Sequence, residues 1–418
     1  MTAAFLRWQG LPLWRRVMAG LVGGILLGLL WPAASGWIAV VGDLFLRLIR
    51  MLVVPVVFVS IVSGVTALAD PRKLAALGGR TIALFAATTA CAVSIGIAVG
   101  LLVQPGAGAA IGSGEAYPLG EPKPLYDQLV GIVPVNIVEA LAAGDMLAII
   151  FFALAFGFSI VLAGEEGQPV ARLLQSVARV LFQLVGLVME LTPFGVFALI
   201  SAAVARNGVA VFANVGLLAL CVVLGVVLQI ALVHVPLLAL VARRSPVAFF
   251  RSAVDALAIA LATASSAATL PVALRVAIDK MRIDPGVAST VLPIGASIGK
   301  DGTAMYVGLL SVFSLQALGV TPDVPMLGIV LLTGALAAFG TAPIPSASLF
   351  MLAAVLASVG VPAGQTALVI GFVLPFDRLL DMTRTVASAS ANLTVTAVVG
   401  RWQGERPCEK LLPDSSMR

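Results

Sequence analysis

Six ionisable side chains stand within two apolar stretches of the C-terminal half, which is an unusual place for charge. They are Lys300 and Asp301 in segment 287–318, and Asp377, Arg378, Asp381 and Arg384 in segment 365–400. Three are positive and three are negative, so their formal charges cancel. A charge at membrane depth costs several kcal/mol unless it is paired or hydrated, so such residues are candidates for binding a charged solute or an ion. The alternative is a structural ion-pair network that only holds two helices together.

A polar stripe follows one face of segment 365–400. Its members recur at helical spacing and are Asp377, Asp381, Arg384, Thr385, Ser388 and Asn392. The planar guanidinium of Arg384 matches a carboxylate in bidentate geometry, and Asp381 lies three residues before it. The two side chains can hold the carboxylate and the ammonium of one small molecule. The stripe therefore predicts a binding site for a small molecule that carries both of these charges.

The composition excludes a soluble protein and narrows the classes of function. Hydrophobic residues make up 60% of the 418 residues and charged residues 11%, with a mean hydropathy of +1.10, whereas soluble domains carry about 25% charged residues. Such a chain has lipid as its solvent and holds about eight to ten membrane segments. The net charge of +5 therefore gives no reason to expect nucleic acid as a partner. One histidine and three scattered cysteines provide no metal cluster or hydrolase triad, so we expect neither an enzyme nor a cofactor.

Six apolar segments typical of ordinary membrane spans occupy the N-terminal part of the chain. They are 17–31, 44–68, 81–103, 146–163, 180–204 and 211–242. If the N-terminus is cytoplasmic, the Lys and Arg residues between these spans gather on the cytoplasmic side, and the opposite side receives only Lys123 and Arg206. The positive-inside rule therefore predicts cytoplasmic N- and C-termini. The polar loop 104–145 lies outside and is expected to be a linker.

Two later apolar segments are interrupted midway. Segment 246–280 is broken by small and polar residues at 264–269, and segment 324–360 is broken by the Gly- and Pro-containing stretch 340–346. Broken backbone at membrane depth is stable only inside protein or beside a cavity, so we expect two re-entrant hairpins. Each precedes a longer segment, and this internal repeat of hairpin and helix indicates the substrate site of a transporter. The alternative is two kinked spans whose small residues pack at helix interfaces.

Several motifs along nearly the whole chain resemble one known family. They are 42–55, 132–136, 193–197, Ser265-Ser266-Ala267-Ala268-Thr269-Leu270-Pro271, Asp301-Gly302-Thr303 and Asp381-Met382-Thr383-Arg384-Thr385. On these motifs the chain resembles the dicarboxylate/amino acid:cation symporter family, the glutamate transporter homologues. The resemblance implies an all-α integral membrane protein with eight transmembrane helices and two re-entrant helical hairpins. It also implies a homotrimer in the lipid bilayer, in which each protomer works as an elevator.

The resemblance further divides the chain into a fixed scaffold and a moving transport domain. The implied parts are 1–79 (scaffold spans 1 and 2), 80–103 (transport-domain span 3), 104–145 (extracytoplasmic linker), 146–204 (scaffold spans 4 and 5), 211–242 (transport-domain span 6), 244–401 (transport core with hairpin 1, span 7, hairpin 2 and span 8) and 402–418 (cytoplasmic tail). The second hairpin would be the extracellular gate. We expect the protein in the cell inner membrane.

Residue by residue, the resemblance implies a pocket for an anionic amino acid such as aspartate or glutamate. Arg384 would bind the side-chain carboxylate and Asp381 the α-ammonium group. The other implied substrate-binding residues are Ser265, Ser266, Thr303, Ile344, Thr385 and Ser388. Dicarboxylate carriers of the family lack a carboxylate at the position of Asp381, so its presence favours an amino acid over succinate or malate.

The ion site departs from the sodium-coupled pattern of the family. Gly299 and Lys300 stand in place of the Asn and Met of an Asn-Met-Asp motif. In the last helix Ser388 and Asn392 stand in place of an Asn and an Asp, and in the third span Phe85 stands in place of a Tyr. The candidate coupling residues are Thr88, Thr89, Gly295, Ser297, Gly299, Lys300, Asp301, Asp377 and Asn392. Because sodium needs hard oxygen ligands, the losses weaken its site, although a carbonyl-built site near the second hairpin stays an open alternative.

These departures predict a symporter that does not use sodium. The Lys300 ammonium would take the place of a bound cation beside Asp301, and protons would drive transport, with Lys300, Asp301, Asp377 and Asp381 as candidate carriers. His234, alone in an apolar span, is expected to be a packing residue rather than a proton carrier. The alternatives are a C4-dicarboxylate or other amino-acid carrier still coupled to sodium, with Lys300 as a fixed counter-ion, and an anion-conducting channel on the same scaffold.

Overall fold

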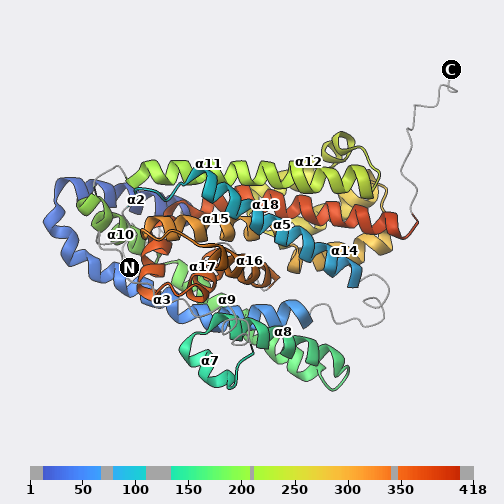
Figure 1. Ribbon diagram of the computed structural model, residues 1–418, viewed down its shortest axis with the longest axis horizontal. Coiled ribbons are helices and arrows are strands. Elements are labelled where there is room, and N and C mark those ends of the chain that lie inside the picture. Colours follow the sequence, from blue (N-terminus) through green and yellow to red (C-terminus); the bar gives the residue numbers. More distant parts are fainter. Residues whose placement is uncertain (1–12, 67–78, 110–132, 208–210, 340–346, 405–418) are drawn as a thin grey trace, which may run out of the picture.

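A computed structural model gives the fold of the protein (Figure 1). It describes residues 13–66, 79–109, 133–207, 211–339 and 347–404, and all regular elements in these ranges are helices. They are α2 (Leu13–Leu30), α3 (Pro32–Thr66), α5 (Gly79–Val103), α7 (Ile137–Ala143), α8 (Met146–Leu162), α9 (Gln168–Met189), α10 (Thr192–Asn207), α11 (Val211–Gln229), the π-helices η3 (Ile230–His234) and η4 (Leu237–Val241), α12 (Pro246–Thr263), α13 (Ser266–Arg275), the π-helix η5 (Val276–Lys280), α14 (Pro285–Ile298), α15 (Asp301–Ala317), α16 (Val324–Phe339), α17 (Ala347–Ser358) and α18 (Ala363–Trp402).

The N-terminal helices form one packed group. α2 packs along α10, and α3 packs against α8, α9 and α10. Between α3 and α8 the rings of Phe58, Phe152 and Phe156 stack with centroid distances of 5.6–6.5 Å. The Arg16 guanidinium of α2 donates to Glu190 at 2.6 Å, in the turn between α9 and α10. Apolar packing and this ion pair therefore hold the five helices together.

The expected span 180–204 has the wrong bounds. In the structure α9 already begins at Gln168, and the chain turns at Glu190 and Leu191 before α10 starts. Pro193, in the first turn of α10, explains the break. Proline has no N–H to donate and disfavours helical backbone in the residue before it.

The expected linker 104–145 contains a helix that the sequence analysis missed. Asn136 caps the start of α7, because its side chain accepts from the Val138 N–H at 3.0 Å. α7 ends at Gly144, whose φ of 72° suits a residue without a Cβ. With seven residues, α7 is too short for the apolar periodicity on which helix prediction depends.

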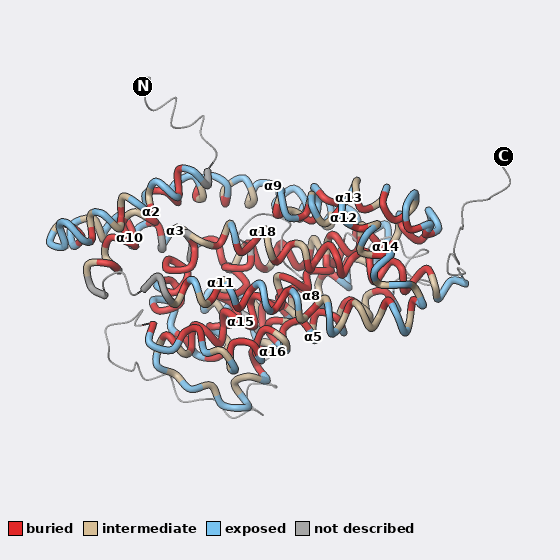
Figure 2. Tube along the Cα trace, turned by 90° about the horizontal axis from the view of Figure 1, so that it is seen from above, coloured by how far each residue is buried: buried red, intermediate tan, exposed pale blue. Residues whose placement is uncertain are grey.

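The C-terminal helices surround the interior pair α15 and α18. Figure 2 shows buried residues concentrated along these two helices. Small residues let α5 approach α15 closely, since a Cβ on Gly96 would collide with the Met305 carbonyl oxygen and one on Gly100 would meet Val312 at 2.9 Å. α5 can therefore present its polar side chains directly to the start of α15.

The first expected hairpin is broken where the sequence predicts it. α12 ends at Ala264 in left-handed backbone (φ 51°), and Ser265 then caps α13 by accepting from the Ala268 N–H. α13 and η5 pack back along α12, and Lys280 of η5 contacts Asp255 of α12 at 2.7 Å. The two arms therefore form a helical hairpin whose tip is the sequence 264–265.

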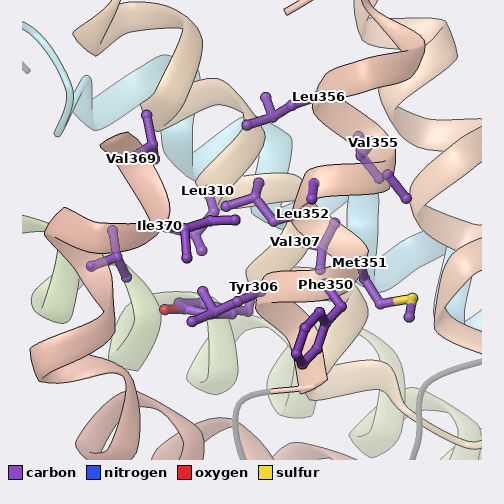
Figure 3. Packing of buried hydrophobic residues seen from close by; sticks show 14 of the residues in the cluster. Tyr306, Val307, Leu310, Phe350, Met351, Leu352, Val355, Leu356, Val369 and Ile370 are labelled. Atoms are coloured by element: carbon purple, nitrogen blue, oxygen red, sulfur yellow. The ribbon is translucent and has the colours of Figure 1, made fainter. Parts of the chain in front are cut away.

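The second expected hairpin has the arms α16 and α17, which also pack on each other. Its tip, 340–346, lies outside the described residues. Figure 3 shows how α17 joins the interior: Phe350 and Leu352 of α17 face Val307 and Leu310 of α15, and Ile370 of α18 lies beside them. The second arm is thus packed against both helices that carry the charged residues.

By length and composition, four helices of the described chain could each cross a membrane: Gly79–Val103, Gln168–Met189, Asn214–Val241 and Pro246–Thr263. A fifth would be the pair Ala363–Leu374 and Phe376–Trp402, bent by 80°. α12, the first arm of the first hairpin, is one of these four. Large apolar side chains such as Trp37, Val180 and Leu220 lie exposed on the outside, as a surface that faces lipid requires.

Candidate substrate and ion site

The interior helices α14 and α15 meet at a break of two residues. Gly299 and Lys300 have non-helical backbone, and Asp301 is the first residue of α15. The last carbonyls of α14 and the first N–H groups of α15 therefore lack helical partners, and their partial charges suit a cation and an anion respectively. A Cβ on Gly302 would collide with the Arg384 carbonyl oxygen. This glycine lets the break lie directly against the polar stripe of α18.

Arg384 lies at the centre of a buried set of charges. Its Nε and Nη2 both reach Oδ1 of Asp381, at 3.0 and 2.9 Å, and its Nη1 reaches Oδ1 of Asp377 at 3.1 Å. The guanidinium lies over the ring of Tyr306, 4.2 Å from its centroid, and the Tyr306 hydroxyl donates to Asp377 at 3.0 Å. Arg384 is 1% exposed. The structure therefore confirms that the stripe charges predicted from spacing lie together.

The two carboxylate oxygens of Asp377 have different surroundings. Its Oδ1 accepts from both Arg384 and Tyr306, whereas its buried Oδ2 has no hydrogen-bond partner among the described residues. A buried acceptor without a donor is costly. The site thus has an oxygen that can accept a hydrogen bond or a proton.

Lys300 does not pair with Asp301 as expected. It is 4% exposed, and within the described part of the chain it has no recorded hydrogen bond or ion pair. The charge that acts on its ammonium is the Asp381 carboxylate. Lys300 and Arg384 therefore both interact electrostatically with Asp381.

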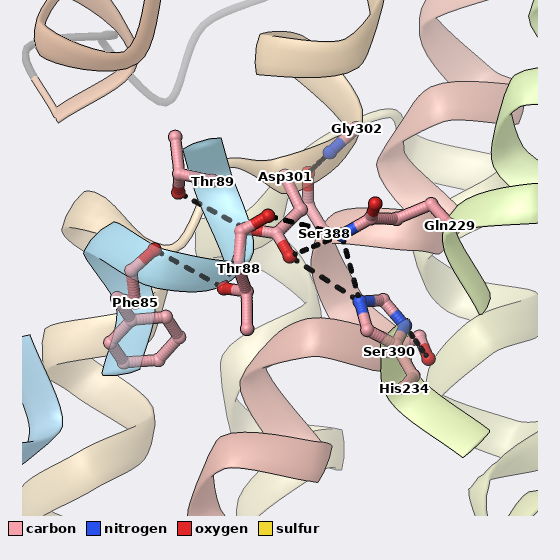
Figure 4. A network of polar contacts seen from close by, with 9 residues as sticks. All are labelled: Phe85, Thr88, Thr89, Gln229, His234, Asp301, Gly302, Ser388 and Ser390. Carbon is pink, nitrogen blue, oxygen red and sulfur yellow. Dashed lines mark hydrogen bonds and ion pairs between the residues drawn. The ribbon is translucent and has the colours of Figure 1, made fainter. Parts of the chain in front are cut away.

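Asp301 instead points to the other side of the break, towards α5 and α11 (Figure 4). Its Oδ1 accepts from the hydroxyls of Thr88 and Thr89, both at 3.1 Å. Its Oδ2 accepts from Gln229 Nε2 at 2.9 Å and lies 3.3 Å from His234 Nε2. The carboxylate is fully buried and has four partners from its own chain, which is why it does not need Lys300.

Gln229 and His234 are the site residues that the sequence analysis missed. His234 was expected to be a packing residue; it is fully buried but bonds to Asp301 and, through Nδ1, to Ser390 Oγ at 2.9 Å. The two side chains are five residues apart and lie at the π-helix η3, where the wider turn brings such positions to one side. An α-helical period does not connect them. Their presence as polar residues in a long apolar span was the signal that could have found them.

Four further predicted residues of α14, α15 and α18 lie around the break. Ser388 Oγ accepts from the Gly302 N–H at 3.1 Å, and Thr385 Oγ1 donates to the Asp381 carbonyl at 2.7 Å. Thr303 is half-buried in the first turn of α15. Ser297 donates to the Pro293 carbonyl of its own helix at 3.1 Å.

The first hairpin tip reaches α18. Arg378 donates to the Thr263 carbonyl at 3.4 Å, directly before the predicted residues Ser265 and Ser266. Ser266 is buried and Ser265 is half-buried. Ile344, the predicted residue of the second tip, lies outside the described residues.

Buried, mutually paired charges at a break between two interior helices of an apolar helical protein define a membrane carrier for a charged solute. The profile of the sodium:dicarboxylate symporter family matches residues 13–402. The chain therefore belongs to this family of transporters and is a multi-pass membrane protein.

Relatives with two different named substrates cover almost the whole chain. A proton/sodium-glutamate symport protein of Bacillus caldotenax is 33% identical over 410 residues, covering 94% of this chain and 95% of the relative. A proton/sodium-glutamate symport protein of Bacillus subtilis (strain 168) is 31% identical over 405 residues (93% and 92%). A C4-dicarboxylate transport protein of Brucella anthropi is 31% identical over 412 residues (96% and 90%). Identity alone does not choose between an amino acid and a dicarboxylate, so the choice depends on the site.

Proposed function

We propose that the protein is a secondary active transporter that carries an anionic amino acid, aspartate or glutamate, together with protons and without sodium. The observation that carries the proposal is the buried set of Arg384, Asp381 and Asp377 at the helix break. Helix packing alone does not need these charges, because apolar residues of similar volume stabilise an interior equally well.

Substrate binding can proceed by exchange of ion-pair partners. In the structure Asp381 occupies two of the N–H groups of Arg384. A carboxylate of the substrate matches the same fork and can replace Asp381 there, while Asp377 keeps Nη1 and the Tyr306 hydroxyl in place. The released Asp381 then accepts the ammonium of the substrate. Each group stays paired in both states, so neither state buries an isolated charge.

This exchange favours an amino acid over a dicarboxylate. A C4-dicarboxylate has no ammonium, so after it displaces Asp381 from Arg384 the carboxylate of Asp381 would face a second anion. Like charges in a buried site are strongly unfavourable. An amino acid provides both charges that the exchange requires, in agreement with the names of the glutamate-carrying relatives.

Proton coupling is supported by the groups around the break. Lys300, Asp301, Asp377 and Asp381 are buried ionisable residues that could bind or release a proton, and we propose them as candidate carriers. The unpartnered Oδ2 of Asp377 is one place for such a proton. Lys300 and Arg384 carry as many positive charges as Asp377 and Asp381 carry negative charges, so these four groups need no added cation.

We further propose an elevator mechanism in a homotrimer, with both termini on the cytoplasmic side of the inner membrane. The mutual packing of α2, α3, α8, α9 and α10 supports a scaffold, and the enclosure of the site by α5 and α11–α18 supports a separate moving unit. On this basis we propose the division of the chain into the scaffold and transport segments given above, with α7 inside the segment assigned to the linker.

We expect Lys300→Met to weaken sodium-free binding of aspartate and glutamate by about tenfold or more, ~1.4 kcal/mol. The substitution leaves the Asp377–Asp381–Arg384 group with one excess negative charge, which repels an anionic substrate. Affinity is measured by isothermal titration of the purified protein in sodium chloride and in choline chloride of equal ionic strength. Sodium restores part of the affinity of the variant if a free cation can take the place of the ammonium.

Lys280→Met is the matched control, because Lys280 pairs with Asp255 at the surface and is half exposed. Exposed pairs contribute about 0–1 kcal/mol, so this variant is expected to bind like the wild type. Unchanged sodium-free binding in Lys300→Met would remove Lys300 from the mechanism. A tenfold effect of sodium on the wild type would contradict sodium-independent coupling.

A further inference from the structure

Three of the positions at which this chain departs from the sodium-coupled pattern meet at one point. Phe85 comes from α5, Gly299 from the end of α14 and Asn392 from α18. A Cβ on Gly299 would collide with the Asn392 carboxamide and would lie 2.6 Å from Cε1 of Phe85. A Cβ on Gly295, one turn earlier, would lie 2.7 Å from the same carboxamide and 2.8 Å from Cζ of Phe85. The two glycines therefore create the space that the amide and the ring fill.

The Asn392 carboxamide bonds to the end of α14. With its nitrogen towards α14, the side chain donates to the Gly295 carbonyl at 3.1 Å and to the Gly299 carbonyl at 3.2 Å. This orientation is assigned because the opposite one would set the amide oxygen against two acceptors. The nitrogen thus lies between two carbonyl oxygens, and its two N–H groups satisfy one each.

Two converging carbonyls at the C-terminal end of a helix form a cation-binding arrangement, because the helix dipole adds negative potential to their lone pairs. An amide nitrogen provides positively polarised hydrogens at the same place without a net charge. A sodium ion there would need further oxygen ligands, but Phe85 contributes only an apolar ring edge. The nearby carboxylate of Asp301 is bonded to Thr88, Thr89, Gln229 and His234. The donors present therefore do not fit a sodium ion.

We infer that the Asn392 carboxamide is a built-in substitute for a monovalent cation at the end of α14, and that replacing this one residue by aspartate opens a sodium site. The inference rests on the proposed sodium-independent function and names the group responsible for it. It assigns this role to Asn392, whereas the sequence alone indicated Lys300. The carboxylate that interacts with Lys300 is Asp381.

The test is the cation dependence of thermal stability, which needs no knowledge of the substrate. Wild type, Asn392→Asp and Asn392→Leu are purified, and Tm is measured in sodium, potassium and choline chloride at equal ionic strength. We expect wild type and Asn392→Leu to show the same Tm in sodium and choline. In Asn392→Asp the carboxylate and the two carbonyls bind the ion, so saturating sodium raises Tm by about 2–4 °C over choline.

A folded Asn392→Asp variant without a sodium-specific rise in Tm overturns the inference and leaves the proposed function standing. A sodium-specific rise in the wild type that persists in Asn392→Leu contradicts the sodium independence itself and locates the ion elsewhere. The two failures are therefore distinguishable.

A second experiment keeps the inference testable if Asn392→Asp does not fold. Gly299→Ala places a methyl group against the carboxamide, so we expect it to lower Tm in the wild-type background. In the Asn392→Ala background the amide is absent, and the loss of Tm caused by Gly299→Ala should be at least halved. Equal losses in both backgrounds would show that Asn392 does not occupy this position.

Discussion

Arg384→Ala is expected to abolish binding of aspartate and glutamate, with a loss of affinity of at least about hundredfold, ~2.7 kcal/mol. A hydrogen bond to a charged group contributes about 1.5–3 kcal/mol. A guanidinium can form two such bonds with one carboxylate of the substrate. Truncation also leaves Asp377 and Asp381 without this cation, which lowers the free energy of unfolding, and not the affinity, by about 3–5 kcal/mol. The variant keeps the helix and the apolar interior around Tyr306, so we expect it to remain folded.

Binding is measured by isothermal titration calorimetry. Each variant is first required to elute as a single species in size-exclusion chromatography and to retain the circular dichroism of a helical protein. Arg384→Lys keeps the charge but not the planar fork, so its affinity should lie between those of wild type and Arg384→Ala. Arg275→Ala is the control, since Arg275 is exposed on α13, and it should bind normally. Wild-type-like affinity for both amino acids in Arg384→Ala would refute the assignment of this residue.

Asp381→Ser is expected to change the class of substrate. The serine removes the carboxylate that would accept the substrate ammonium and also frees the Arg384 fork. Affinity for aspartate should fall by about hundredfold, whereas affinity for succinate, which has no ammonium, should stay or rise. The ratio of the two dissociation constants is the measured quantity, because it cancels any general loss of stability.

Asp377→Asn provides the contrast on the same helix. Asp377 supports Arg384 and Tyr306 and has no role with the ammonium, so both substrates should weaken by a similar factor. If Asp381→Ser instead lowers the affinity for aspartate and succinate equally, Asp381 only positions Arg384 and does not select amino acids.

The charged part of the site could be predicted from the sequence because it is local. Asp377, Asp381 and Arg384 lie within two turns of one helix, and helical spacing alone brings their side chains to one face. The first hairpin was predictable for the same reason, since small residues at Ala264 and Ser265 mark a break in an apolar run. The second tip cannot be compared, because it lies outside the described residues.

The surroundings of Asp301 depend on contacts between segments that are distant in the sequence, so the spacing of residues could not predict them. Thr88 and Gln229 reach Asp301 from positions 213 and 72 residues away in the chain. Lys300 stands next to Asp301 in the sequence, but the partners of Asp301 in the structure are Thr88, Thr89, Gln229 and His234. Likewise, the departures at Gly299 and Asn392 could be seen one at a time, whereas their contact required the structure.

Uptake into proteoliposomes under separately imposed gradients tests the central claim most directly. Purified protein is reconstituted, and uptake of labelled aspartate and glutamate is followed under an inward proton gradient without sodium, and under an inward sodium gradient without a pH difference. We predict accumulation of at least one of the two amino acids above equilibrium with the proton gradient and none with the sodium gradient. Accumulation that requires the sodium gradient and is indifferent to the proton gradient would contradict the account.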